Sequence, residues 1–178
     1  YRASKNAAKE ILHGLARMSE ARGKDSSGMA FLDFDRNEAK VLKGNLRLRE
    51  LLKDPSTQSN LNASLDAWRK QGVPFLALGH ARLVTNGSQL EQVNNQPVVK
   101  NGDLLIHNGI ITNHEGLWET LHQKREFQID SEVILATLRE KLSSSMGEIS
   151  LSQVFDHMEG TYSIMAFLGT SETMLLAS

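Results

Sequence analysis

Four polar clusters interrupt or end apolar stretches of the chain, and their residue types could carry acyl-transfer chemistry. In the most informative cluster, the apolar run Leu104–Ile106 stops at His107-Asn108-Gly109. An amide side chain next to an unhindered glycine N–H supplies the two kinds of donor that hold a developing oxyanion. We expect a buried strand that ends at this polar pair. Because Asn-Gly is also a common turn dipeptide, a plain strand followed by a turn is the alternative interpretation.

A second cluster, residues 79–87, places Arg82 at the end of a short apolar strand. A guanidinium group there is costly to bury unless an anion meets it. Its planar fork binds carboxylates through two parallel hydrogen bonds, so a substrate carboxylate would suit it. A structural salt bridge would suit Arg82 equally well.

The other two clusters lie at element boundaries. Residues 22–28 resemble a helix-to-strand turn in which Asp25 and the two serines satisfy backbone groups. Asp130, in the cluster 130–133, is either a helix cap or a carboxylate that pairs with an ammonium group of a ligand. A free α-amino acid whose side chain carries a reactive carbonyl would complement Arg82, Asp130 and Asn108 together. Glutamine fits, although spacing alone does not select it.

Composition bounds the class of protein. The 178 residues are 40% hydrophobic and 23% charged, which indicates a globular protein. The formal net charge of −1 gives no excess of positive charge that would attract nucleic acid or an anionic membrane. No apolar stretch approaches the length of a membrane span, so we expect a cytoplasmic protein. We expect no cofactor and no metal, because the histidines, of which there are 6, follow no metal-ligand spacing. The chain has no cysteine.

Hydrophobic periodicity predicts the elements that position these clusters. They are a helix over 5–21, a hairpin of 29–32 with 40–42, two short helices between 46 and 68, a strand over 75–78, a long loop over 85–97 and a hairpin of 98–99 with 104–106 around Asn101-Gly102. Three more helices are expected, with caps at Asn113, at Asp130 or Ser131, and at Ser150 with Gln153, before closing strands over 161–168 and 173–176. Adjacent hairpins with helices predict an α+β protein with antiparallel sheets.

The clusters, in their order, resemble the class II glutamine amidotransferase domains. This family includes the glutaminase domains of glucosamine-6-phosphate synthase, amidophosphoribosyltransferase and asparagine synthetase. Residues 22–28 are similar to its RGxDSxG motif, 79–87 to GHTRWATHG, 94–97 to NxxP, 106–111 to VHNGII, 129–133 to TDTEV and 160–163 to GAYS. The resemblance covers the chain from Arg22 nearly to its end.

The resemblance implies a fold and a domain organisation. The fold is that of the N-terminal-nucleophile hydrolases, a four-layer αββα sandwich of two stacked antiparallel sheets. Residues 1–178 would form a single glutaminase domain, truncated at both ends, without its nucleophile segment and its last strands. The expected partners are L-glutamine, a synthase or acceptor domain that is fused or associated downstream, and a second copy in a homo-oligomer.

The resemblance also implies a mechanism and site residues. Glutamine would be hydrolysed through a γ-glutamyl thioester on an N-terminal cysteine whose α-amino group is the base, and ammonia would pass to the acceptor. Arg82 would hold the glutamine carboxylate with Thr85. Asp130 and the Gly109 carbonyl would hold the amino group. The Asn108 side chain and the Gly109 N–H would form the oxyanion hole.

The chain departs from the family pattern at three positions. The family nucleophile precedes the position of Tyr1, so these residues alone are expected to bind glutamine without turning it over. Asn86, which replaces a common histidine, completes the predicted substrate-binding set, and Leu83 replaces a frequent tryptophan. Two alternatives stay open: a binding or regulatory homologue that has no nucleophile, and a γ-glutamyl amide hydrolase that does not channel ammonia.

Overall fold

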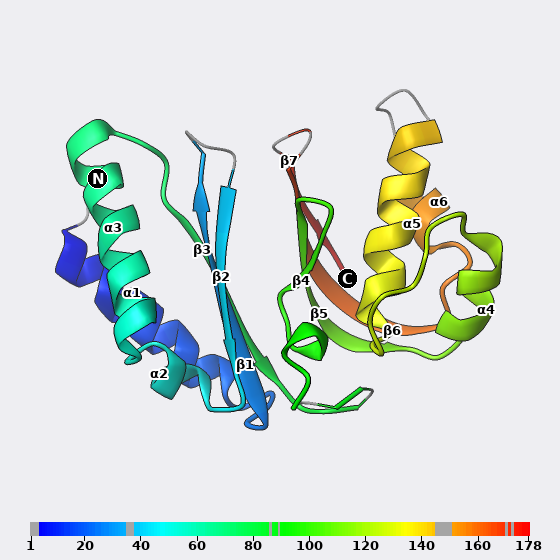
Figure 1. Cartoon of the computed structure of the whole chain (residues 1–178), viewed down its shortest axis with the longest axis horizontal. Helices are drawn as coiled ribbons and strands as arrows, with labels where there is room; N and C mark the ends of the chain where they lie inside the picture. The colour runs from blue at the N-terminus through cyan, green and yellow to red at the C-terminus, as the bar shows by residue number, and fades with distance from the viewer. Residues whose placement is uncertain are drawn as a thin grey trace. The chain divides into compact units, whose positions relative to one another are not determined.

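A computed structural model describes residues 4–34, 38–85, 87, 88, 90–144, 151–169, 171 and 173–178. The chain forms two compact units, residues 1–84 with 89–97 and residues 85–88 with 98–178. Each unit holds one antiparallel sheet that carries helices on one face (Figure 1). The predicted α+β class with two antiparallel sheets is therefore confirmed.

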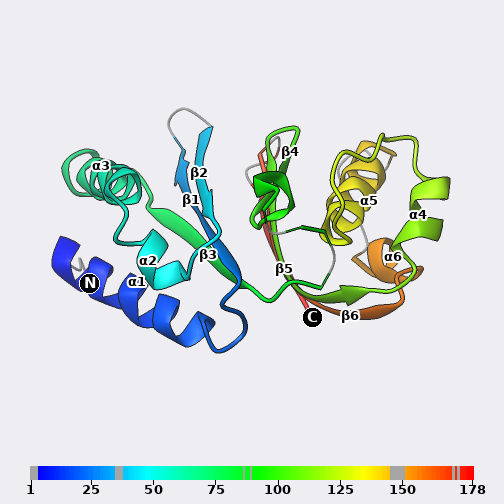
Figure 2. The ribbon, with the colours of Figure 1, turned by 60° about the horizontal axis from the view of Figure 1, so that its bottom comes forward.

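The first unit is built on a three-stranded sheet with the order β2-β1-β3. Its strands are β1 (Ser26–Asp33), β2 (Glu38–Gly44) and β3 (Leu76–Arg82). Its helices are α1 (Lys5–Ser19), α2 (Leu48–Leu51) and α3 (Pro55–Gln71), and the 3-10 turn η1 (Gln92–Asn94) lies in the predicted loop. Figures 1 and 2 show all three helices on one side of this sheet.

Helix α3 shows how local sequence sets a boundary. The Asp54 carboxylate accepts the backbone N–H groups of Ser56 at 2.9 Å and Thr57 at 3.1 Å, and Pro55 occupies the first helical position, where its missing N–H costs nothing. Gly72 ends the helix with a φ of 77°, a left-handed conformation that favours glycine. Two helices were predicted here, but the second is longer than expected.

Alternation along β1 divides the first sheet into two faces. One face packs against the helices. Its core comprises Ala16, Met29, Phe31, Leu48, Leu51, Leu52, Leu61, Leu65 and Ala81. The other face carries Ser26, Gly28 and, across the ladder, Arg82. The strand β3 also runs farther than the predicted 75–78, because Gly79 to Arg82 pair with β1 despite their polarity.

The second unit is built on a four-stranded sheet with the order β4-β5-β6-β7. Its strands are β4 (Val98–Lys100), β5 (Asp103–Ile111), β6 (Gly160–Leu168) and β7 (Thr173–Ala177). Its helices are α4 (His114–Thr120), α5 (Ser131–Ser144) and α6 (Leu151–Phe155), which lie on one side of the sheet (Figure 1). The predicted strands and helices of this unit all form. Ser150, half of the predicted capping box, lies outside the described residues.

The predicted turn at Asn101-Gly102 is confirmed. Asn101 has a φ of 53° and Gly102 a φ of 85°, the pair of positive values that a two-residue type I′ hairpin requires. The turn sets Lys100 opposite Asp103 and Val98 opposite Leu105. This register puts Val98 and Leu105 on the face that packs against α5.

Asn113 precedes α4 as expected, but its role differs from the predicted cap. Its side chain makes no capping hydrogen bond to the helix. Instead its Nδ2 donates to the His157 carbonyl at 2.8 Å, and its Oδ1 accepts the Glu159 N–H at 3.0 Å. Asn113 therefore fastens the chain after β5 to the segment that enters β6. Among the described residues, no helix is long and apolar enough to cross a membrane.

Candidate functional site

Arg82 lies at the end of β3, where its side chain is 5% exposed. It pairs across the ladder with Ser26, the first residue of β1. Its Nη1 donates to the side-chain oxygen of Asn95 at 2.8 Å, and the Ser26 hydroxyl donates to the same oxygen at 2.7 Å. A buried amide from the loop after β3 thus orients the guanidinium group.

The segment 22–28 holds the backbone around Arg82. The Asp25 N–H donates to the Arg82 carbonyl at 3.1 Å, and the Asp25 carboxylate accepts the Val84 N–H at 2.9 Å. A Cβ placed on Gly23 would lie 2.2 Å from the carbonyl carbon of Arg82, so only glycine permits this approach. The predicted turn in which Asp25 satisfies backbone groups is confirmed.

The two serines of this segment behave differently from each other. The Ser27 hydroxyl donates to the Leu46 carbonyl at 2.7 Å, as a residue that satisfies backbone groups should. The Ser26 hydroxyl binds the Asn95 side chain instead. The expectation that both serines satisfy backbone groups is therefore correct for Ser27 and wrong for Ser26.

The loop before β4 packs closely on β1. A Cβ on Gly28 would lie 2.0 Å from the carbonyl oxygen of Gln96, and the peptide bond from Gln96 to Pro97 is cis. Asn94 and Asn95 are 1% and 0% exposed, which shows that this polar loop is an internal part of the first unit. The loop brings the Asn95 oxygen to Arg82.

The segment His107-Asn108-Gly109 does not end its strand. Strand β5 continues to Ile111, and Asn108 pairs with Ser163 and Gly109 with Tyr162 of β6. The prediction of a strand that stops at this polar pair is therefore wrong. Pairing with a strand more than fifty residues away overrides the local turn tendency of Asn-Gly.

Gly109 is required by its surroundings. Its φ is 144°, and a Cβ there would lie 2.0 Å from the carbonyl oxygen of Thr161. The absence of a side chain lets β6 approach β5 closely and leaves the peptide on both sides of Gly109 unhindered.

The backbone polar groups of Gly109 face the β4 side of β5. Ladder hydrogen bonds alternate sides along a strand, so every second residue from Asp103 to Ile111 directs its N–H and C=O to the same edge. The tight turn makes Lys100 and Asp103 a hydrogen-bonded pair, which identifies this edge as the β4 edge. Strand β4 pairs only as far as Leu105. Within the described part of the chain, no strand pairs with Gly109 on this edge.

The next group along this edge binds Asp130. The Ile111 N–H donates to Oδ2 of Asp130 at 2.8 Å, and the Asp130 side chain is nearly fully buried. The other carboxylate oxygen, Oδ1, has only the Ser131 hydroxyl at 3.5 Å within the described residues. Since an ionised carboxylate offers about four acceptor positions, Asp130 keeps the capacity to accept further hydrogen bonds.

The His107 side chain lies on the face of β5 that faces α5. Its Nδ1 lies 3.0 Å from the Ser131 hydroxyl and its Nε2 lies 3.5 Å from the Thr161 carbonyl. A carbonyl can only accept, so Nε2 carries the proton and Nδ1 accepts the serine hydroxyl. Burial lowers the pKa of His107, although the Asp130 carboxylate and the Thr161 carbonyl act in the opposite direction. His107 is therefore a neutral, hydrogen-bonded residue.

The start of α5 is anchored by a buried ion pair. Lys100 Nζ contacts Oε1 of Glu132 at 2.5 Å and donates to the Lys124 carbonyl at 2.6 Å. Glu132, which is 0% exposed, also accepts the N–H groups of Glu126 at 3.0 Å and Phe127 at 2.8 Å. These contacts fix the loop that leads to Asp130.

The remaining predicted site residues are Asn108, Thr85 and Asn86. Asn108 is exposed, on the face of β5 opposite to His107. Thr85 is also exposed. Asn86 lies outside the described residues. Arg82 belongs to the first unit, whereas Asn108, Gly109 and Asp130 belong to the second.

The sequence patterns did not predict two of these contacts. In the sequence, Asn95 is marked only by its place in the NxxP motif, and no local pattern shows that the loop is buried or that Asn95 contacts Arg82. Lys100 and Glu132 are distant in sequence, and nothing local marks them as partners.

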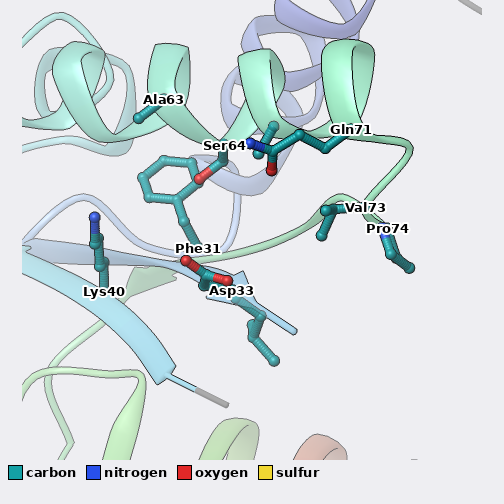
Figure 3. A pocket seen from close by; sticks show the side chains of 10 residues that line it. Phe31, Asp33, Lys40, Ala63, Ser64, Gln71, Val73 and Pro74 are labelled. Atoms are coloured by element: carbon teal, nitrogen blue, oxygen red, sulfur yellow. The ribbon is translucent and has the colours of Figure 1, made fainter. Parts of the chain in front are cut away.

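A separate cavity of about 390 Å³ lies in the first unit between α3 and the strands β1 and β2. Figure 3 shows Asp33 and Lys40 on the strands, with Ser64 and Gln71 on α3, around the ring of Phe31. None of the predicted site residues lines this cavity.

Comparison with protein families assigns the chain. A family model described as a glutamine amidotransferase domain matches residues 80–178, more than half of the chain and the part that contains Arg82, Asn108 and Asp130. The chain belongs to the class II glutamine amidotransferase domain family. Within this amidotransferase domain, the matched region holds four of the six motifs on which the resemblance rests.

Two relatives agree with this assignment. The domain is 32% identical over 165 residues to a glutamine–fructose-6-phosphate aminotransferase of Aliivibrio fischeri, covering 90% of this chain and 24% of that protein. It is 33% identical over 175 residues to the protein of the same name from Chlorobaculum tepidum, covering 92% of this chain and 26% of that protein. The amidotransferase domain thus spans about a quarter of the length of these relatives.

Solved structures share the fold. The glutamine phosphoribosylpyrophosphate amidotransferase of B. subtilis, solved with ADP and GMP, matches with a TM-score of 0.61 and 22% identity, covering 96% of this chain and 34% of that chain. A structure described as the allosteric regulatory enzyme of purine biosynthesis also matches with a TM-score of 0.61, at 23% identity, covering 98% and 35%. These matches confirm that the amidotransferase domain has the fold of such enzymes.

Proposed function

We propose that the 178 residues form a single glutaminase domain within a longer amidotransferase. The domain binds L-glutamine and hydrolyses its side-chain amide to glutamate and ammonia. The ammonia then passes to an acceptor bound on another domain. Membership of the family and the small share of each relative that the chain covers support this proposal.

The observation that carries the proposal is the edge of β5 at Gly109. Its N–H and C=O point to an edge that β4 leaves after Leu105 and that Asp130 occupies at Ile111. A donor, an acceptor and a bound carboxylate are thereby aligned along residues 109–111 of one strand edge. The N–H suits an oxyanion, and the C=O and carboxylate suit an ammonium group.

Roles follow from these chemistries. Asp130, through Oδ1, and the Gly109 carbonyl hold the glutamine amino group. The Asn108 amide and the Gly109 N–H hold the oxygen of the amide under attack. Arg82 holds the α-carboxylate with Thr85, and Asn86 completes the binding set.

The attacking thiol comes from outside these residues, because the chain has no cysteine. The thiol sulfur forms a bond to the amide carbon of glutamine, and the C–N bond breaks with a proton delivered to nitrogen, which releases ammonia. Water then cleaves the thioester to glutamate and restores the thiol. Asn108 and Gly109 stabilise the negative oxygen in both steps.

Lack of a cysteine also favours a second candidate, a domain that binds glutamine without hydrolysing it. Arg82 and Asp130 have the same roles in the two candidates. Only the glutaminase also has a cysteine thiol that attacks glutamine. A γ-glutamyl amide hydrolase that releases ammonia to solvent would share all the residues and lack only the acceptor.

The test uses the complete gene product. We expect it to release glutamate and ammonia in equal amounts and to be labelled at one cysteine by a diazoketone analogue of glutamine. Glutamine binding by calorimetry without turnover or labelling would establish the binding module instead. No binding in either assay would overturn the proposal. Release of all ammonia to solvent in the presence of candidate acceptors would indicate the simple hydrolase.

A further inference from the structure

The imidazole ring of His107 lies next to Gly109 and joins β6 to the start of α5. The residue is 3% exposed, on the face of β5 that also carries Gly109. A Cβ on Gly109 would lie 2.9 Å from His107 Nε2, so the ring fills the space that a side chain at position 109 would need. The same Nε2 lies 3.5 Å from the Thr161 carbonyl of β6, and Nδ1 lies 3.0 Å from the Ser131 hydroxyl of α5.

The Ser131 hydroxyl has two acceptors within reach. Its oxygen lies 3.0 Å from His107 Nδ1 and 3.5 Å from Oδ1 of Asp130. Ser131 and Asp130 are 1% and 4% exposed, so this choice is made in the interior of the second unit. A hydroxyl carries one hydrogen, which it directs at one acceptor at a time. The shorter contact takes this hydrogen, and Oδ1 of Asp130 keeps its acceptor positions.

The protonation state of His107 fits this direction of donation. Nε2 carries the hydrogen because it faces a carbonyl, and Nδ1 is therefore the acceptor. Burial lowers the pKa of His107, against the opposite influences of the Asp130 carboxylate and the Thr161 carbonyl. The ring therefore accepts the Ser131 hydrogen as a neutral imidazole.

We propose that His107 is a positioning residue for Asp130 and acts through the Ser131 hydroxyl. By accepting the only hydrogen of that hydroxyl, His107 turns it away from Oδ1 of Asp130, which stays open to the ammonium group of glutamine. This inference rests on the proposed function, in which Oδ1 holds that ammonium group. His107 thereby sets the affinity for the amino group and takes no part in the attack on the amide.

The main test is His107→Met in the complete gene product. Without the ring, the Ser131 hydroxyl directs its hydrogen at Asp130 and competes with the ligand. The KM for glutamine should rise about five- to tenfold with little change in kcat, the effect of about one hydrogen bond. The probe for specificity is glutaramate, which is glutamine without its amino group. Its inhibition constant should stay the same, and an equal loss for both ligands would overturn the inference.

A second substitution separates this role from a purely structural one. The double variant His107→Met with Ser131→Ala has no hydroxyl that could turn toward Asp130. Its KM for glutamine should therefore return to within about twofold of the value in the unchanged protein. A structural role predicts the reverse, because another change in a buried contact adds to the damage. A double variant with a KM as high as that of His107→Met would overturn the inference.

Two amide variants divide the contacts of the ring. In His107→Asn the amide oxygen takes the place of Nδ1 and accepts from Ser131, whereas in His107→Gln the amide nitrogen takes the place of Nε2 and donates to Thr161. The KM should stay low in His107→Asn and rise in His107→Gln. The reverse order would assign the effect to the contact with β6 and contradict the inference.

Thr137→Val is the matched control. Thr137 also carries a buried hydroxyl on α5, and this hydroxyl donates to the Val133 carbonyl at 2.8 Å. The control should leave the KM unchanged, and a rise equal to that of His107→Met would show only a general effect on α5. Asp130→Asn distinguishes the two proposals. If it raises the KM and His107→Met does not, the inference fails and the proposed function stands. If neither variant alters the KM, the ammonium site of the proposed function fails.

Discussion

The Asp130 carboxylate accepts the Ile111 N–H at 2.8 Å, two residues beyond Gly109 on the same edge of β5. This contact ties the start of α5 to the strand that carries Asn108. It also leaves Oδ1 of Asp130 with one distant contact, the Ser131 hydroxyl at 3.5 Å. A single carboxylate thereby combines a structural contact with the capacity to bind a ligand.

Asp130→Asn should raise the KM for glutamine by about 10- to 100-fold and change kcat less, because the amide oxygen can still accept from Ile111 while the charge that attracts an ammonium group is lost. Steady-state glutaminase kinetics on the complete gene product measure this. Asp130→Ala also removes the acceptor of a buried N–H and should cost about 1–3 kcal/mol of stability. An unchanged KM in Asp130→Asn would refute the ammonium-binding role.

Asn108→Ala should lower kcat about 10²–10³-fold with little change in KM, since an oxyanion donor acts mainly in the transition state. Asn108 is exposed, so the thermal unfolding midpoint should hardly move. Equal and small effects from Asn108→Ala and Asp130→Asn would show that the two roles are wrongly assigned.

Gly109→Ala should destabilise the protein by about 2–4 kcal/mol, because its φ is 144° and the new Cβ would meet the Thr161 carbonyl at 2.0 Å. Urea unfolding followed by circular dichroism measures the loss. The control is Gly116→Ala in α4, where a Cβ meets nothing within 4 Å. It should be neutral or stabilise by up to about 1 kcal/mol. Similar stability of both variants would contradict the close approach of β5 and β6.

Lys100→Met should cost about 3–5 kcal/mol, because it leaves the carboxylate of Glu132 buried without its ion-pair partner. The double variant with Glu132→Gln should lose clearly less than the sum of the two single losses. A double-mutant cycle in urea provides the measurement. Lys70→Met, at a lysine whose side chain is 76% exposed beside Asp66, should stay within about 0.5 kcal/mol of the unchanged protein.

Lys43→Met should increase stability at pH 7 by up to about 3 kcal/mol, because the folded protein holds this lysine at a pKa of about 8 and the unfolded chain at its usual value of 10.5. Between these values the unfolded state binds more protons, so the stability of the unchanged protein rises with pH. The advantage of Lys43→Met should be full below pH 8 and vanish near pH 10.5. Urea unfolding across this range tests it, and a constant difference would refute the cause.

Much of the fold could be predicted from local patterns. The apolar run from Met29 to Leu32, paired with the run 40–42, and the Asn101-Gly102 turn are signals carried by a few neighbouring residues, and both hairpins form. The apolar residues 75–78 locate the strand that leads to Arg82, although its extension to Arg82 depends on pairing with β1. These predictions succeeded because the deciding interactions are short in sequence.

Long-range contacts explain what was missed. The strand β5 passes through Asn108-Gly109 because β6, which begins at Gly160, supplies the pairing. The Asn113 side chain hydrogen-bonds to the backbone of His157 and Glu159 and not to its own helix. The pairing of β5 with β6 brings these backbone groups to Asn113. No pattern within a short window contains either partner. The roles of Arg82, Thr85, Asn86, Asn108, Gly109 and Asp130 in binding and catalysis stay predictions.

The contact of Arg82 with Asn95 explains why an uncharged amide suits position 95 better than a carboxylate does. An aspartate would fit the same space and hold the guanidinium more strongly, because a charge-assisted pair is roughly twice as strong as a hydrogen bond to a neutral group. It would also cancel the positive charge from within the protein. In the proposed function Arg82 attracts a carboxylate from solvent, and an aspartate at position 95 would weaken that attraction. The uncharged amide accepts both Ser26 and Arg82 and leaves the attraction to the ligand.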